Sequence, residues 1–386
     1  MPDFDFDAVD RTHINSVKWD VAPGELPMWV ADMDFATAPA VIDAVKQRME
    51  NPTYGYSFIP EEYNQAVSSW WKRRHDHDID PHNIIFATGV IPAVSSAVRS
   101  LTNPAEKVVI QSPVYNIFYN SIINNGRRVI DAPLAYTGGE YSMDFEALEK
   151  AFSDPLATMM ILCNPHNPVG KAWSRNDLAR VGELADKYHI TVVSDEIHCD
   201  IMDPAVTHIP FASADPACRR VAVTCCSPSK AFNLAGLHSA YVMIDEPWIR
   251  HRVERGLNTD EVAEPNVVAC QSTIAAYSQD GAQWLDALNG YIQGNKDHAA
   301  AALSDALPGL HIPRSEATYL MWIDCSAYTD DAEKLQGYVC QETGLYVSSG
   351  HVYGEAGRTF LRMNLGTSRS LVEDGVQRLI AALRSL

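Results

Sequence analysis

Short apolar runs alternate with amphipathic segments through the middle of the chain. Between Asn83 and Asp245 the apolar runs are Ile84–Ala87, Val108–Ile110, Met159–Cys163, Thr191–Ser194, Val221–Cys225 and Ala240–Ile244. Runs of this length and character are typical of strands that are buried on both faces, and the stretches between them, such as Arg175–Tyr188, have the period of a helix. The pattern predicts an α/β fold with a mostly parallel sheet covered by helices.

The flanking regions follow different patterns. The residues before Pro39 mix aromatic and acidic side chains and predict an ordered arm, which is followed by helices at Pro39–Arg48 and Glu61–Arg74. Helices dominate from Pro247 to about Leu307, and the remainder predicts a smaller α+β domain with strands at Tyr319–Ile323, Leu345–Ser348 and Thr359–Met363 and a helix at Ser368–Leu386. We therefore expect an arm and helix at 1–48 that belong with the small domain, a large domain at 49–280 and a small C-terminal domain at 281–386.

Composition narrows the class of protein. The chain has 386 residues, of which 46% are hydrophobic, and this length suits two domains. A formal net charge of −19 argues against a nucleic-acid partner and against an anionic membrane surface. No apolar run reaches transmembrane length, the acidic start Met1–Asp7 is not a signal peptide, and eight cysteines without a C-x-x-C pair do not predict a disulfide framework. We expect a reduced, cytoplasmic protein.

Chemically suggestive residues follow five successive predicted strands. They are Thr88-Gly89, Tyr115, Asn167, Asp195 and Lys230. Each has an ordinary structural explanation by itself, since Thr-Gly forms turns and an acid after a strand often caps the next helix. The carboxyl ends of parallel strands meet at one edge of a sheet, and ligands of open α/β sheets bind there. The sequence therefore predicts one site that contains all five.

These residue types together suit pyridoxal phosphate. Lys230 would form a Schiff base with its aldehyde, because a desolvated lysine loses its proton readily. Asp195 would keep the pyridine nitrogen protonated, which makes the ring an electron sink. Tyr115 would stack on the ring, and Asn167 would donate to the ring hydroxyl oxygen. Lys230, Asp195 and Tyr115 are the expected catalytic residues.

The phosphate group would lie at the start of a helix. Backbone N–H groups at Gly89, Val90 and Ile91 and the positive end of that helix dipole would bind it. Ser227 and Ser229, three residues and one residue before the lysine, would add hydroxyl groups. The cofactor would thus be bound within the 49–280 domain.

Several longer motifs occur in the chain, namely Trp29–Phe35, Tyr54-Gly55-Tyr56, Asn164–Gly170, Ser194–His198, Ser227–Gly236 and Arg362–Gly366. In these motifs, nearly end to end, the chain resembles the fold-type-I pyridoxal phosphate enzymes of the class I/II aminotransferase superfamily, which have a mostly parallel, seven-stranded type of sheet. It is most similar to the C–S lyase branch, which contains the cystathionine β-lyases, cystalysin and the maltose-regulon modulator. Ala31–Phe35 and Asp195–His198 point to that branch.

The resemblance implies roles for further residues. Arg362 should bind the α-carboxylate of an amino-acid substrate, a task that suits a guanidinium fork. Asp34 and Phe35 of the arm, together with Asn167, should also contribute to substrate binding. Tyr54 should reach the phosphate in the neighbouring subunit, which implies a homodimer.

Two histidines belong to the same implied site. His198 stands where many relatives carry a tyrosine near the ring oxygen. His238 occupies the place of a phosphate-binding arginine that many aminotransferases carry eight residues after the lysine. Phosphate binding would then depend more on backbone amides, serines and Tyr54, and on pH.

The implied activity is β-elimination. Lys230 would take the Cα proton, a thiolate would leave from Cβ, and pyruvate and ammonia would follow; L-cystathionine would release homocysteine. An aminotransferase shares the early steps and stays open as an alternative, as does a regulatory protein that binds the cofactor without catalysis. No metal is expected, because the run His75-Asp76-His77-Asp78 is interpreted as a solvated helix end.

Overall fold

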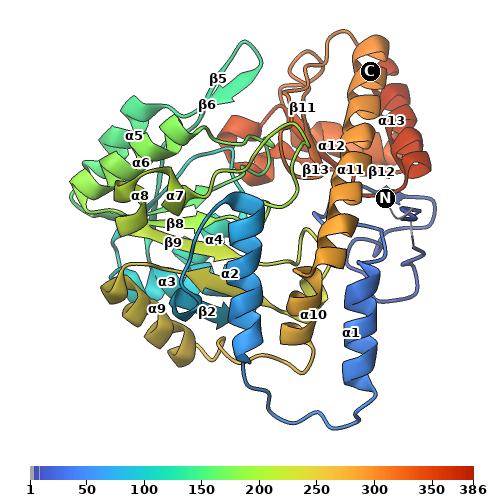
Figure 1. The fold of residues 1–386 in the computed structure, drawn as a ribbon. Coiled ribbons are helices and arrows are strands. Elements are labelled where there is room, and N and C mark those ends of the chain that lie inside the picture. Colours follow the sequence, from blue (N-terminus) through green and yellow to red (C-terminus); the bar gives the residue numbers. More distant parts are fainter. Residues whose placement is uncertain (1–3, 8) are drawn as a thin grey trace.

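A seven-stranded sheet lies at the centre of the structure, a computed structural model that describes residues 4–7 and 9–386 (Figure 1). Its strands, in spatial order, are β2 (Ile84–Ala87), β10 (Ala240–Met243), β9 (Ala222–Cys226), β8 (Thr191–Asp195), β7 (Ala157–Cys163), β3 (Lys107–Ile110) and β4 (Arg128–Asp131). Strand β10 pairs antiparallel with β2 and with β9, and all other pairs in this sheet are parallel. The predicted mostly parallel sheet is therefore confirmed.

Helices cover both faces of this sheet. Met159 and Ile161 of β7 belong to a core with one set of helices, α3 (Val90–Leu101), α4 (Ile117–Ile123) and α9 (Pro247–Thr259). Met160 and Leu162 of the same strand belong to a core with the other set, α5 (Phe145–Phe152), α6 (Arg175–Tyr188), α7 (Phe211–Ala214) and α8 (Pro216–Val221). Successive side chains of a strand point to opposite faces, so strands covered on both sides are apolar throughout.

The sequence pattern missed some strands of the large domain. The edge strand β4 begins and ends with charged residues, Arg128 and Asp131, which are exposed because only β3 pairs with it. Charged ends interrupt the apolar run by which the other strands were predicted. A short hairpin, β5 (Ala135–Thr137) and β6 (Glu140–Ser142), was missed as well.

A three-stranded sheet forms the centre of the C-terminal part. Its order is β11 (Leu320–Asp324), β14 (Phe360–Asn364) and β13 (Ser348–Ser349), and α12 (Ala332–Thr343) and α13 (Arg369–Arg384) pack nearby. The predicted single strand Leu345–Ser348 is wrong, because β12 (Leu345–Tyr346) pairs with β1 (Leu26–Pro27) in another sheet. Leu345, Val347 and Ser349 are all buried, so the alternation continues although the chain changes sheets.

The N-terminal arm lies against this C-terminal part. The Asp34 N–H donates to the carbonyl of Gly366, and the Asn364 N–H donates to the carbonyl of Met28. Helices α1 (Pro39–Met49), α2 (Glu61–His75), α10 (Ala269–Ala276) and the long α11 (Gln279–Ala306) complete the fold, and α11 runs beside α1 and α13 in Figure 1. The arm is thus part of a framework that also holds β14.

One hydrophobic cluster includes residues from all three predicted segments. Phe35 of the arm, Trp70 of α2 and Leu285 of α11 are buried members of it. The division into 1–48, 49–280 and 281–386 therefore stays a prediction. None of the helices in residues 4–7 and 9–386 is long and apolar enough to span a membrane.

Candidate active site

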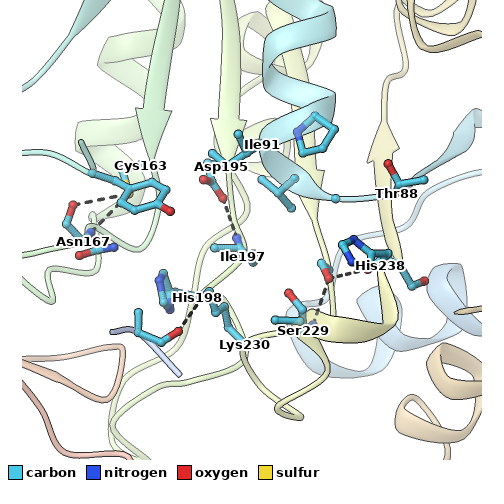
Figure 2. A pocket seen from close by; sticks show the side chains of 18 residues that line it. Thr88, Ile91, Cys163, Asn167, Asp195, Ile197, His198, Ser229, Lys230 and His238 are labelled. Carbon is cyan, nitrogen blue, oxygen red and sulfur yellow. Dashed lines mark hydrogen bonds between the residues drawn. The ribbon is translucent and has the colours of Figure 1, made fainter. Parts of the chain in front are cut away.

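A cavity of about 280 Å³ lies at the carboxyl ends of β7, β8 and β9. Figure 2 shows the cavity surrounded by Asn167, Asp195, Ile91, Thr88, His198 and Lys230. The structure brings together most of the residues predicted for the cofactor, and those that line this cavity are Gly89, Val90, Ile91, Tyr115, Asn167, Asp195, His198, Ser227, Ser229, Lys230 and His238.

The amine of Lys230 projects into this cavity from the turn that follows β9. Its Nζ donates to the carbonyl oxygen of Ala31 at 2.6 Å, so the lysine also contacts the N-terminal arm. Burial lowers the pKa of Lys230, while the carboxylates of Asp32 and Asp195 act in the opposite direction. The neutral amine, which is the nucleophilic and basic form, is therefore more accessible than in a surface lysine.

Asp195 is the last residue of β8 and is buried. Its Oδ1 accepts a hydrogen bond from the Ile197 N–H at 3.1 Å, and no salt bridge involves it within the described part of the chain. Burial raises the pKa of Asp195 to about 7, although that backbone hydrogen bond lowers it. A buried carboxylate of this kind favours a cationic N–H donor from a ligand.

Arg362 extends from the central strand of the small sheet toward Asn167. Its Nη1 donates to Asn167 Oδ1 at 3.1 Å, and its Nη2 donates to the carbonyl of Trp29 at 2.7 Å. The guanidinium carbon lies 4.8 Å from the centre of the Tyr353 ring, and Arg362 Nε has no hydrogen-bond partner within residues 4–7 and 9–386. These contacts hold the fork in place and leave it donor capacity for a carboxylate.

The start of α3 supplies the anion-binding end of the cavity. Gly89 precedes the helix and provides no side-chain cap, so the first backbone N–H groups of the helix are available to a ligand. Ser227 Oγ donates to the Ser239 carbonyl at 2.6 Å and accepts from the Ser229 N–H at 3.0 Å. The hydroxyl proton of Ser227 is thus already donated to a backbone carbonyl and is not free for a phosphate. His238, where many aminotransferases carry an arginine, also lines this end.

The ring of His198 is buried beside the lysine. Burial lowers the pKa of His198 to about 3, and its Nδ1 has no hydrogen-bond partner among the described residues. The imidazole is therefore neutral at physiological pH. Burial also raises the pKa of Tyr115 to about 12, so this phenol keeps its proton.

These groups fit pyridoxal phosphate. The buried carboxylate of Asp195 matches a protonated ring nitrogen, and the uncapped start of α3 matches a phosphate. The amine of Lys230 lies in the same cavity and could hold the aldehyde carbon covalently. His198 Nδ1 is a buried polar atom that a ligand would satisfy.

A second cavity, of about 580 Å³, adjoins the first. Both are lined by Ala31, Tyr115 and Lys230, and the second also contains Arg362. From Arg362 it extends along the arm to α12. We call it the substrate-side cavity, because the residue expected to bind the substrate carboxylate lines it.

The structure does not place Asp34 or Phe35 among the residues that line either cavity, and their predicted contact with substrate stays a prediction. The carboxylate of Asp34 is occupied by Lys18 Nζ at 2.6 Å and Trp19 Nε1 at 2.9 Å. Phe35 packs against the ring of Phe6, with the centroids 5.5 Å apart. Both residues anchor the arm from within.

The residues of the arm that do line the cavities come slightly earlier in the same motif. They are Trp29, Val30 and Ala31, and the last of these accepts the hydrogen bond from Lys230. The motif that starts at Trp29 was a usable signal for them. Tyr353, under the Arg362 guanidinium, carried no comparable signal.

Tyr54 lies outside both cavities in this chain. It is 59% exposed and belongs to the extended segment between α1 and α2. Tyr56 and Phe58 of the same segment are exposed even more. The predicted contact of Tyr54 with a neighbouring subunit therefore stays a prediction.

The run His75-Asp76-His77-Asp78 is only partly the solvated helix end that was predicted. Asp76 and Asp78 are exposed, but His75 and His77 are buried. His75 follows Trp70 and Trp71 on the inner side of α2, and this apolar face turns it inward.

His75 is also part of a possible metal-ligand group with Cys199 and Asp200, whose ligand atoms lie within 4.8 Å of one another. His75 Nε2 lies 2.9 Å from Asp200 Oδ1, and the Trp70 indole N–H donates to both oxygens of that carboxylate. These hydrogen bonds account for the group, and we assign no metal to it.

Comparisons with known proteins agree with this geometry. The model of the family described as "Aminotransferase class I and II" matches residues 26–379. "Cystathionine beta-lyase PatB" of Bacillus subtilis (strain 168) is 41% identical over 381 residues, which cover 97% of this chain and 98% of that protein. "Protein MalY" of Escherichia coli (strain K12) is 34% identical over 392 residues, with 99% and 100% covered.

The fold is also found in a solved structure. Cystalysin from Treponema denticola, whose crystal structure contains a pyridoxal 5'-phosphate cofactor, superimposes with a TM-score of 0.95 at 31% identity and covers 100% of both chains. This likeness confirms the predicted fold class, an α/β fold of type I with a smaller domain.

Proposed function

The chain belongs to the class I and II aminotransferase family, and from that premise we propose that it is a pyridoxal-phosphate-dependent carbon–sulfur lyase. Its substrates would be L-cystathionine or related S-conjugates of cysteine, and its products a thiol, pyruvate and ammonia. The observation that carries the proposal is the placement of Lys230 between a cofactor-sized cavity and the cavity that contains Arg362. The identity of 41% over almost the full length of a named cystathionine beta-lyase favours this activity over transamination.

Residues from both the seven-stranded and the three-stranded sheet would bind and orient the cofactor and the substrate. Arg362 would bind the α-carboxylate of the substrate, while its hydrogen bonds to Asn167 and Trp29 fix its orientation. Asp195 would hold the ring nitrogen of the cofactor, and the start of α3 would hold its phosphate. When bound, pyridoxal phosphate withdraws electrons from Cα of an amino acid and so makes the Cα–H bond acidic.

Lys230 would take the Cα proton of the substrate. Its lowered pKa favours the neutral amine, and Nζ would take the proton from Cα of a substrate held by Arg362. Departure of the thiolate from Cβ releases the thiol, and the remaining three-carbon fragment hydrolyses to pyruvate and ammonia. The burial of Tyr115 and His198 around the reacting atoms keeps bulk water away from the proton being moved.

We extend the proposal to assembly and location. The exposed aromatic residues Tyr54, Tyr56 and Phe58 suit a homodimer interface through which Tyr54 reaches the neighbouring cofactor. All eight cysteines lie in the described part as free thiols, which suits a reducing cytoplasm.

The test is product analysis of the holoenzyme with L-cystathionine. We expect equal amounts of pyruvate and homocysteine, and we expect both to fall at least about a thousandfold in Lys230→Ala, because the base is lost. Release of neither product from any cysteine thioether by the cofactor-loaded enzyme would refute the proposal. Stoichiometric conversion of an added 2-oxo acid without pyruvate would identify an aminotransferase instead.

A further inference from the structure

The far end of the substrate-side cavity carries a carboxylate without a partner. Glu333 lies in the first turn of α12, is exposed to solvent, and lines this cavity. Its backbone N–H donates to Asp331, but its carboxylate forms no hydrogen bond or ion pair within residues 4–7 and 9–386. The neighbouring Lys334 does not neutralise it, because Lys334 Nζ pairs with Asp331 at 3.1 Å.

The other charged groups of this cavity are already engaged. Lys230 and Arg362 lie at the reacting end, where each has a role in the proposed chemistry. His351 Nε2 lies 3.7 Å from the carboxylate of Asp331, so this ring too faces an acid. Glu333 is therefore the unmatched charge at the end of the cavity that lies away from the reacting atoms.

Aromatic residues in the wall of the same cavity also suit a cation. Trp29 and Tyr346 also line the cavity, with their ring centroids 5.3 Å apart and their planes nearly perpendicular. Aromatic rings attract cations through their quadrupole, whereas they offer nothing to an anion. Gln336, one turn after Glu333, adds a neutral amide.

We propose that Glu333 selects substrates whose sulfur-linked group ends in a positively charged amine. This inference rests on the proposed lyase activity and specifies its substrate class. A thioether substrate held at Arg362 by its carboxylate extends its sulfur side along the cavity toward α12. An ammonium group there would be attracted by the Glu333 carboxylate and bind more tightly, whereas a carboxylate there would be repelled and bind more weakly.

Three cysteine thioethers of similar length test the proposal. They are S-(2-aminoethyl)-L-cysteine, the neutral S-propyl-L-cysteine and the anionic S-carboxymethyl-L-cysteine, each assayed by pyruvate release from the holoenzyme. We expect kcat/KM for the aminoethyl compound to exceed that for the propyl compound about two- to fivefold, as for a partly exposed ion pair, and that for the carboxymethyl compound to be the lowest.

Two variants assign the effect to Glu333. Glu333→Gln removes the charge and keeps the shape, so we expect its aminoethyl-to-propyl ratio to fall to about one. Glu342→Gln makes the same change on the exposed part of α12 outside the cavity and should keep the ratio of the unaltered enzyme. The ratio within each enzyme cancels any general effect of the substitution on folding or cofactor content.

The outcomes separate this inference from the proposed function. Pyruvate from all three compounds with equal kcat/KM overturns the role of Glu333 and leaves the lyase activity intact. An unchanged ratio in Glu333→Gln does the same. If the holoenzyme releases pyruvate neither from these three compounds nor from L-cystathionine, the lyase proposal itself is overturned.

Discussion

The two ends of the active site are built in different ways. At the cofactor end, Asn167, Asp195 and Lys230 lie at or just after the carboxyl ends of three neighbouring strands of one sheet, so the strand order places them together. At the substrate end, Trp29 and Arg362 come from opposite ends of the chain and meet through a single hydrogen bond of 2.7 Å. One end depends on a continuous hydrogen-bonded sheet, and the other depends on how an arm lies against a small domain.

This difference concerns rigidity as well as position. The strands beneath the cofactor end are packed on both faces by hydrophobic cores, which fix the strand ends closely. At the substrate end, Arg362 is fixed on β14 of the small sheet, but Trp29 belongs to an arm that is held together internally by a buried ion pair between Lys18 and Asp34. Substitutions should therefore affect the two ends differently.

The largest effect should come from breaking that ion pair. Asp34→Ala leaves the buried amine of Lys18 without its partner at 2.6 Å, and breaking a buried pair from one side costs about 3–5 kcal/mol. We expect this loss in the free energy of unfolding, measured by urea denaturation of the holoenzyme. KM should change little at a temperature where the variant is folded, because Asp34 lines neither cavity.

An exposed acid of α1 provides the control. Asp43→Ala should change the free energy of unfolding by no more than about 0.5 kcal/mol, as surface substitutions generally do. A raised KM together with unaltered stability in Asp34→Ala would instead support a direct contact of Asp34 with substrate.

The same contrast explains what the sequence could predict. Residues that follow apolar runs end up at one edge of a parallel sheet, so Asp195 and Lys230 could be placed in one site from local pattern and topology. The motif Trp29–Phe35 indicated the arm but not which of its residues turn inward, and nothing local indicates that the Tyr353 ring lies under Arg362. The resemblance to the family supplied Arg362, and within the arm it named Asp34 and Phe35 but not Ala31, which lines both cavities.

Prediction of the elements failed for a related reason. Strand β4 has one neighbour and charged ends, and β12 and β13 continue one alternation across two sheets. In each case pairing with a distant segment decides the structure, and this information is not local. Buried strands such as β7 were predicted well because burial on both faces requires apolar residues along almost the whole strand.

A pH experiment examines the rigid end. An unfolded aspartate has a pKa of about 3.9, and burial raises that of Asp195 to about 7, so the folded cofactor-free protein binds this proton more tightly. Its stability therefore falls between about pH 4 and pH 7 through this group. Asp195→Asn cannot ionise and should be more stable than the unaltered protein above pH 7, by on the order of 4 kcal/mol, and nearly equal to it near pH 4.

Urea denaturation of both cofactor-free proteins across this range measures the difference. Asp305→Asn, an exposed site on α11, should show no pH-dependent difference. If Asp195→Asn were less stable than the unaltered protein at pH 8, the carboxylate would have a cationic partner within the chain, contrary to the contacts of β8.

The smallest effect concerns Arg362, the residue that links the two ends. Arg362→Lys keeps the charge but loses the planar fork that bonds Asn167 and Trp29, so the substrate carboxylate is held by a mobile point charge. We expect kcat/KM for L-cystathionine to fall about 10- to 100-fold, equal to roughly 1.4–2.8 kcal/mol, mainly through a higher KM.

The cofactor end supplies the control within the same protein. Asp195, Lys230 and the start of α3 form no hydrogen bond with the fork, so cofactor affinity should stay within about twofold. Arg358→Lys, exposed just before β14, should leave kcat/KM unaltered. Loss of cofactor in proportion to loss of activity in Arg362→Lys would mean that the arm and the sheet edge are held as one unit. The hydrogen bond between Arg362 and Asn167 would then fix the substrate end relative to the cofactor end, and the two ends would not differ in the way proposed.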